Sequence, residues 1–205
     1  IFATCSVQEI MDLAPVVHMS ALRGSIPFLH FFDGFRTSHE IQKVKVWDYE
    51  ILHKLMDFEA LQAFRERCLH PAHGKLMGSA QNPDIFFQNR EACNTHYQAL
   101  PHIVEEKLQQ VNQLLGTNYG LFEYYGAKDA EHILVAMGSV CETIEETINS
   151  LNDSDSNAGL IKVRLYRPFS VPHFLKVLPK TVKKITVLDR TKEPGASGEP
   201  LYLDV

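Results

Sequence analysis

Three short apolar runs separated by two helical stretches constrain the fold of the second half of this chain. The runs are "HILVAMG" (132–138), "LIKVRLY" (160–166) and "KITVLD" (184–189), and each reads as a buried strand. Between them, residues 139–151 and 171–178 carry apolar side chains at helical spacing. Buried strands joined through helices predict right-handed crossovers and a parallel sheet covered by helices.

The first half of the chain reads as mostly helical. A serine followed three residues later by glutamate, the capping-box pattern, predicts a helix start at Ser6 with Glu9 and another at Ser139 with Glu142. The helix after Ser6 ends near Gly24 and should be kinked by a proline. Further helices are predicted over residues 48–56, 58–68 and 83–99, and a last one before residue 116.

The stretch "GTNYG" (116–120) reads as a hinge, so we place a domain boundary near residue 120. Residues 1–119 then form one unit and residues 120–205 another. The predicted fold class is α/β, with parallel-sheet layers covered by helices.

Polar residues follow the predicted buried strand over residues 26–32. In parallel α/β sheets the carboxyl ends of strands border the ligand crevice. We therefore take four residues as candidates for the edge of an active-site crevice or for the domain interface below it: Asp33, Arg36, Ser38 and His39. Gly34 is expected to allow a positive φ or the close approach of another backbone. A polar turn that caps the sheet is the alternative reading.

Two later strand ends repeat this pattern. Arg164 and Arg167 follow one strand, and Asp189 and Arg190 follow the next. The candidates for interdomain packing are Arg167, Asp189 and Arg190, although an anion site would use the same residue types. Residues 194–200 predict a rigid turn with no helix opening after it.

Composition excludes several classes of function. The formal net charge of −5 disfavours a nucleic-acid surface, which needs clustered Lys and Arg. No apolar run approaches the ~18 residues that would span a bilayer. The chain begins with Ile rather than Met and reads as an internal piece of a longer protein.

Cysteine and histidine spacing predicts no metal site in this chain. The four cysteines, at positions 5, 68, 93 and 141, form no C-x-x-C pair and read as buried thiols of a reducing compartment. His70 and His73 are separated by a proline that breaks the helix needed to align them.

Five long motifs, taken in order, resemble one enzyme family. They are "PFLHFFDGFRTSHEIQKV" (27–44), "SAQNPDIFFQNREA" (79–92), "AMGSVCETIEETI" (136–148), "IKVRLYRPF" (161–169) and "TVLDRTKEPGASGEPLYLDV" (186–205). Over essentially the whole chain they resemble pyruvate:ferredoxin (flavodoxin) oxidoreductase. The resemblance implies a fragment that joins the end of a domain covering the pyrimidine side of thiamine diphosphate to an incomplete, transketolase C-terminal-like α/β domain.

The resemblance also implies an activity and its cofactors. Pyruvate would be oxidatively decarboxylated with coenzyme A to acetyl-CoA and CO₂, and electrons would pass to ferredoxin or flavodoxin. The implied cofactors are thiamine diphosphate, Mg²⁺ and [4Fe–4S] clusters, and the implied full-length state is a homodimer. The chain has no GDG-type diphosphate motif and no C-x-x-C-x-x-C, so the catalytic residues and the metal and cluster ligands are expected outside it.

Two other readings stay open. The same domains would serve as a non-catalytic scaffold in a related reductase, or as the core of a pyruvate:NADP oxidoreductase. The expected compartment is the cytoplasm, with a hydrogenosome or related organelle as the alternative for a eukaryotic source.

Overall fold

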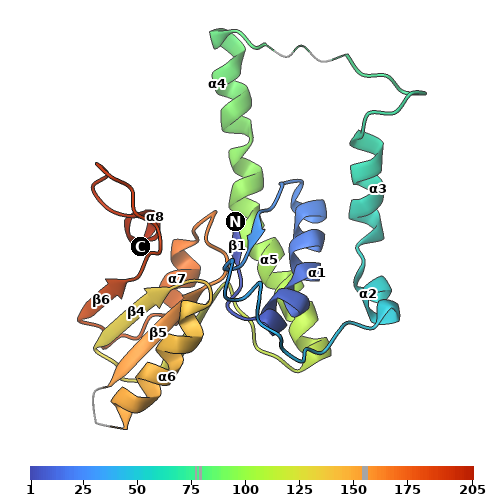
Figure 1. The fold of residues 1–205 in the computed structure, drawn as a ribbon. Coiled ribbons are helices and arrows are strands. Elements are labelled where there is room, and N and C mark those ends of the chain that lie inside the picture. Colours follow the sequence, from blue (N-terminus) through green and yellow to red (C-terminus); the bar gives the residue numbers. More distant parts are fainter. Residues whose placement is uncertain (77, 79, 154–156) are drawn as a thin grey trace.

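The computed structural model describes residues 1–76, 78, 80–153 and 157–205. Helices dominate up to residue 115, and a four-stranded sheet follows (Figure 1). The helical part also holds a small parallel sheet, in which β1 (Phe2–Ala3) pairs with β2 (His30–Phe31). The predicted α/β class with parallel strands is therefore confirmed.

Two long helices, α1 (Val7–Gly24) and α5 (Asn94–Leu115), form the core of the helical part. Their apolar stripes face each other and include the buried residues Leu13, Val16, Leu100, Val104, Leu108 and Val111. The Ser6 hydroxyl caps α1 by accepting the backbone N–H of Glu9 at 3.2 Å, as predicted. In a capping box the Glu9 carboxylate would accept the backbone N–H of Ser6. Here it accepts the backbone N–H of the preceding residue, Cys5, at 2.8 Å.

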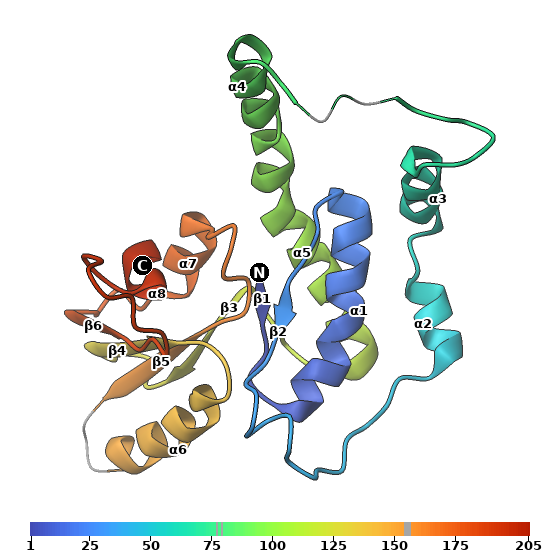
Figure 2. The same ribbon diagram turned by 45° about the horizontal axis from the view of Figure 1, so that its top comes forward.

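Three shorter helices lie outside this core (Figures 1 and 2). Helix α4 (Pro83–Ala92) extends away from it beyond the start of α5, whereas α2 (Tyr49–Leu55) and α3 (Phe58–Arg67) lie beside α1. Of the described residues between 38 and 99, only Ala60 is buried. Exposed apolar side chains gather here, among them Ile41, Val46, Tyr49, Phe58, Leu69, Leu76, Phe86 and Phe87. This segment therefore has local helical structure without a core of its own.

The second sheet runs in the order β3 (Phe122–Gly126), β5 (Ala158–Val163), β4 (His132–Ala136) and β6 (Lys184–Val187). The three predicted strands pair in parallel, as expected. The sequence reading missed β3, which lies antiparallel to β5 at the edge. An antiparallel edge strand on an otherwise parallel sheet is a common arrangement.

Helices cover both faces of this sheet (Figure 2). Helix α6 (Val140–Asn152) packs on one face, where Ile148 joins a cluster with Leu160 of β5. Helix α7 (Val171–Val177) packs on the other, where Phe174 joins the cluster that contains Ile161. Adjacent residues of β5 thus point to opposite faces, so the strand is buried on both sides.

Three predictions of local structure were wrong. The strand expected over residues 26–32 is limited to His30–Phe31, because its partner strand β1 is itself only two residues long. The helix expected over residues 83–99 is interrupted at Cys93, where α5 begins. A short helix, α8 (Pro200–Asp204), opens where a turn alone was predicted. No helix within the described residues is long and apolar enough to cross a membrane.

Candidate functional site

Three segments that are distant in the sequence meet at Asp33. The residue follows β2, and its carboxylate accepts the backbone N–H of Ser139, at the start of α6, at 2.5 Å. The same carboxylate forms an ion pair with the guanidinium of Arg190, which follows β6. The structure thus joins Asp33, a candidate for the crevice edge, to Arg190, a candidate for interdomain packing. We call Asp33, Gly138, Ser139 and Arg190 the Asp33 clasp.

Gly138 is required by the geometry of this clasp. Its φ of +81° is a conformation that L side chains rarely adopt, and a Cβ at this position would lie 2.8 Å from a carboxylate oxygen of Asp33. The glycine therefore allows the chain to turn from β4 into α6 while Asp33 stays in hydrogen-bonding contact with the next residue.

The predicted capping box at the start of α6 was wrong. The Ser139 side chain makes no capping hydrogen bond, and the Asp33 carboxylate accepts the backbone N–H of Ser139 instead. A carboxylate at a helix N-terminus is stabilised by the unpaired N–H groups and the helix dipole. A residue 106 positions away in the sequence thus replaces the local cap.

The clasp keeps Asp33 ionised. Burial by itself raises the pKa of this carboxyl, but the hydrogen bonds from Ser139 and the charge of Arg190 outweigh that effect and hold the pKa below its ordinary value. The Asp33 side chain is 10% exposed, whereas that of Arg190 is 60% exposed, so the arginine reaches the carboxylate from the solvent side.

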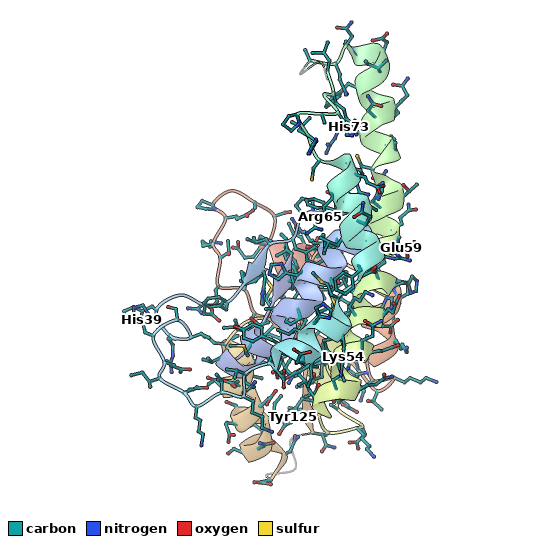
Figure 3. All side chains as sticks on the ribbon, turned by 90° about the vertical axis from the view of Figure 1, so that its right-hand side faces the viewer. His39, Lys54, Glu59, Arg65, His73 and Tyr125 are labelled. Atoms are coloured by element: carbon teal, nitrogen blue, oxygen red, sulfur yellow. The ribbon has the colours of Figure 1, made fainter. Side chains whose placement is uncertain are left out.

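The other three candidates after β2 lie on an exposed turn and do not join the clasp. The Ser38 hydroxyl accepts the backbone N–H of Phe35 at 2.9 Å and lies 2.8 Å from Nδ1 of His39. Arg36 is also exposed, and Figure 3 shows His39 at the outer margin of the molecule. The expectation for Gly34 was wrong, because Phe35 takes the positive φ of 65° and a Cβ on Gly34 would meet nothing within 4 Å.

Arg167 and Asp189 take no part in the clasp, and both contact α8 instead. Nε of Arg167 donates to Asp204 at 2.9 Å, and its backbone carbonyl accepts the amino group of Ile1 at 2.6 Å. Asp189 accepts the backbone N–H groups of Leu201 and Tyr202, in the first turn of α8. Asp189 therefore caps α8, whereas its neighbour Arg190 pairs with Asp33.

A buried ionic network was not foreseen from the sequence. Arg164, whose side chain is 1% exposed, pairs with Glu9 of α1 and with Glu123 of β3, both at 2.7 Å. Its guanidinium also lies 5.0 Å from the ring centroid of Tyr119. The network links α1 to the second sheet. Its one sequence signal was a pair of cations, Lys162 and Arg164, within an apolar run that reads as buried.

Arg164 controls the ionisation of Glu9. Burial raises the pKa of the Glu9 carboxyl, but the charge and hydrogen bonds of Arg164 outweigh it and lower the pKa below its ordinary value of 4.5. Lys162 extends the network, with Nζ at 2.7 Å from both Glu123 and Glu145.

The described residues do not fit an iron–sulfur cluster. All four cysteines are free; Cys5 and Cys141 are buried, whereas Cys68 is exposed and Cys93 half-buried on the helical segment. A [4Fe–4S] cluster needs four converging thiolates, and the described part of the chain offers no such group of cysteines.

Two family models match this chain. Residues 1–108 match the model described as "Pyruvate flavodoxin/ferredoxin oxidoreductase, thiamine diP-bdg". Residues 130–205 match the "Pyruvate:ferredoxin oxidoreductase core domain II". The chain therefore joins a segment that matches the thiamine diphosphate-binding domain model to a segment that matches core domain II of the same enzymes.

Curated relatives match almost the full chain. It is 59% identical over 203 residues to a pyruvate:ferredoxin oxidoreductase of Moorella thermoacetica and 57% identical over 203 residues to a pyruvate-flavodoxin oxidoreductase of Enterobacter agglomerans. Each alignment covers 99% of this chain but 17% of the relative. It is also 51% identical to a pyruvate dehydrogenase [NADP(+)] of Cryptosporidium parvum, over 98% of this chain and 10% of that protein. The chain thus spans about a sixth of the length of the first two.

A solved structure shares the fold. A 2-oxoglutarate:ferredoxin oxidoreductase from Magnetococcus marinus superposes with a TM-score of 0.50 at 16% identity, over 91% of this chain and 34% of that one. At this identity the likeness concerns the fold alone. The two family models together span most of the chain, and on them the chain belongs to the pyruvate:ferredoxin/flavodoxin oxidoreductase family.

Proposed function

We propose that this chain is a segment of an enzyme that oxidatively decarboxylates pyruvate with coenzyme A. The products would be acetyl-CoA and CO₂, and the electrons would pass to ferredoxin or flavodoxin. The observation that carries the proposal is the 57–59% identity to named pyruvate:ferredoxin and pyruvate-flavodoxin oxidoreductases over 98–99% of the chain.

The role of this segment in that enzyme is structural. We propose that residues 1–119 belong to the domain that covers the pyrimidine side of thiamine diphosphate and that residues 120–205 form the transketolase C-terminal-like domain. The diphosphate, its Mg²⁺ and the [4Fe–4S] clusters would be held by the rest of the full-length protein. Thiamine diphosphate would supply the electron sink for decarboxylation, while this chain holds its two domains together through the Asp33 clasp and the Arg164 network.

The full-length protein would act as a homodimer in the cytoplasm, or in a hydrogenosome if the source is eukaryotic. The four free cysteines support a reducing compartment. The NADP-dependent form is the second candidate, because the 51% identity to the Cryptosporidium parvum protein extends over 98% of this chain. A non-catalytic scaffold is the third.

The electron acceptor separates these candidates. With pyruvate and coenzyme A as substrates, we expect the full-length protein to reduce ferredoxin or flavodoxin and to leave NADP⁺ unreduced. The change in absorbance of each acceptor would measure its reduction. Reduction of NADP⁺ by the same protein would favour the second candidate, and reduction of no acceptor would favour the scaffold.

We further propose that Asp33, Arg36, Ser38 and His39 border the active-site crevice or the domain interface below it. Support comes from their position after β2 and from the clasp, which brings Asp33 to the carboxyl ends of β4 and β6. By the same reasoning Arg167, Asp189 and Arg190 would support interdomain packing, as the contacts of Arg167 with Ile1 and of Arg190 with Asp33 suggest.

Arg36→Ala tests the placement at the crevice. Arg36 is exposed in this chain, so its replacement should leave folding unchanged. We expect the turnover of pyruvate by the full-length enzyme, or its assembly as a dimer, to fall several-fold, measured by steady-state kinetics and by size-exclusion chromatography with light scattering. Lys43→Ala, on the same exposed segment, is the control. Wild-type turnover and assembly in Arg36→Ala would remove Arg36 from the crevice.

A further inference from the structure

Two histidines and a glutamate converge between α5 and α7. His102 and Glu105 lie one helical turn apart on α5, and His173 faces them from α7. One ligand atom from each of these residues lies within 4.8 Å of the other two. Residues at i and i+3 of a helix share a face, so the pair on α5 presents both ligands in one direction.

The spacing of the His173 and Glu105 atoms suits two ligands of one metal ion. Nε2 of His173 lies 3.4 Å from Oε2 of Glu105. That distance is beyond the ~2.7–3.2 Å of a good hydrogen bond to nitrogen. Two ligands at ~2.0–2.2 Å from a tetrahedral zinc ion stand about 3.4 Å apart. Both atoms could therefore bind one ion with little movement.

The remaining ring nitrogen of His173 already has the partner that metal-bound histidines need. The Ser170 hydroxyl lies 2.6 Å from Nδ1 of His173. A hydrogen bond at Nδ1 fixes the ring and leaves Nε2 free to ligate, as outer-shell partners do in metal sites. Ser170 is itself buried, so its hydroxyl is held in place.

The site has an open side. A cavity of about 480 Å³ lies between α5 and residues 168–173, and both His102 and His173 line it. Three protein ligands with one position facing a cavity leave room for a water molecule or a small ligand as the fourth. His102 is exposed, so an ion would enter from solvent.

We propose that His102, Glu105 and His173 bind a Zn²⁺ ion that links α5 to α7. Imidazole nitrogens and one carboxylate favour a transition metal over Mg²⁺ or Ca²⁺, and zinc accepts this ligand set in tetrahedral geometry. The ion would join the regions matched by the two family models, since His102 and Glu105 lie within residues 1–108 and His173 within residues 130–205. This inference is independent of the reaction proposed above and departs from the expectation that this chain holds no metal.

Crystals of the full-length protein soaked in Zn²⁺ provide the direct test. Anomalous diffraction recorded on both sides of the zinc absorption edge distinguishes zinc from the iron of any cluster. We expect a zinc peak between His102, Glu105 and His173, with bonds of about 2.0–2.2 Å. The absence of a peak there, with saturating Zn²⁺ in the crystal, would overturn the proposal.

A binding measurement in solution complements the crystal. Loss of an outer-shell partner alone weakens metal binding by ~10–100-fold, so His102→Gln should weaken Zn²⁺ binding at this site at least about 100-fold. Equilibrium dialysis with elemental analysis would show one zinc fewer per protomer in that variant. His96 is an exposed histidine on the same helix, and the His96→Gln variant should bind as many zinc ions per protomer as the wild type. Equal zinc in the wild type and His102→Gln would contradict the site, and because His102 is exposed, the variant should fold.

Discussion

Replacing Arg164 with alanine should destabilise the full-length protein by about 3–5 kcal/mol, because a buried ion pair that loses one partner leaves an uncompensated charge. Arg164 is fully buried and pairs with Glu9 and Glu123 at 2.7 Å. Urea unfolding followed by circular dichroism would measure the change in the free energy of unfolding.

Arg23→Ala is the matched control for this variant. Arg23 also faces two carboxylates, those of Asp57 and Glu59, but its side chain is 47% exposed. Exposed ion pairs contribute ~0–1 kcal/mol, so this change should be small. Equal effects of Arg23→Ala and Arg164→Ala would contradict the special role of the buried network.

The effect of Arg164→Ala should also depend on pH. In the wild type the lowered pKa of Glu9 means that its ionised form stabilises the fold above pH 4.5, and that this contribution is lost as the pH falls through the folded-state pKa. Without Arg164, only the hydrogen bond from Cys5 and the charge of Lys162 oppose the effect of burial on the pKa of Glu9. We therefore expect this pKa to rise in the variant, so that stability is lost as the pH rises. The difference between the two proteins should therefore shrink from pH 7 toward pH 4.5.

The second large effect is expected at Gly138. An alanine there would occupy a φ of +81°, which costs an L residue ~1–2 kcal/mol. Its Cβ would lie 2.8 Å from the Asp33 carboxylate, so the hydrogen bond to Ser139 would lengthen and cost a further ~1–2 kcal/mol. We expect Gly138→Ala to destabilise the protein by about 2–4 kcal/mol in all.

Gly34→Ala is the control that distinguishes disruption of the clasp from a general effect of replacing a glycine. Gly34 is the next residue after Asp33, and a Cβ on it meets nothing within 4 Å. This variant should unfold like the wild type, whereas Gly138→Ala should also speed amide hydrogen exchange at the start of α6. Slow exchange at Ser139 in Gly138→Ala would show that the clasp does not hold this helix end.

Much of the second unit could be predicted from the sequence because its strands are buried on both faces. Their runs of apolar residues indicate β4, β5 and β6 without any partner being known. The edge strand β3 was missed because its burial pattern is mixed and it follows directly on the predicted hinge. Helix α8 has only five residues, too few for periodicity to reveal it.

The site was harder to predict because its contacts join distant residues. The sequence indicated that Asp33 and Arg190 each follow a strand, but β2 and β6 belong to different sheets. Their pairing across 157 residues therefore depends on the three-dimensional fold. The Arg164–Glu9 pair spans 155 residues and the His173–Glu105 contact 68. Helices α2 to α4 were predicted as helices, yet their placement follows from no packing rule, because almost none of their residues is buried within this chain.

Acetyl-CoA formation by the full-length protein tests the central claim most directly. The protein, loaded with thiamine diphosphate and supplied with pyruvate, coenzyme A and oxidised ferredoxin or flavodoxin, should form one acetyl-CoA and one CO₂ per pyruvate consumed. Chromatography of the acyl-CoA product and release of CO₂ from labelled pyruvate would measure both. If the loaded protein consumes no pyruvate with every acceptor present, the proposed reaction is contradicted. Only the fold and the family membership of this chain would then stand.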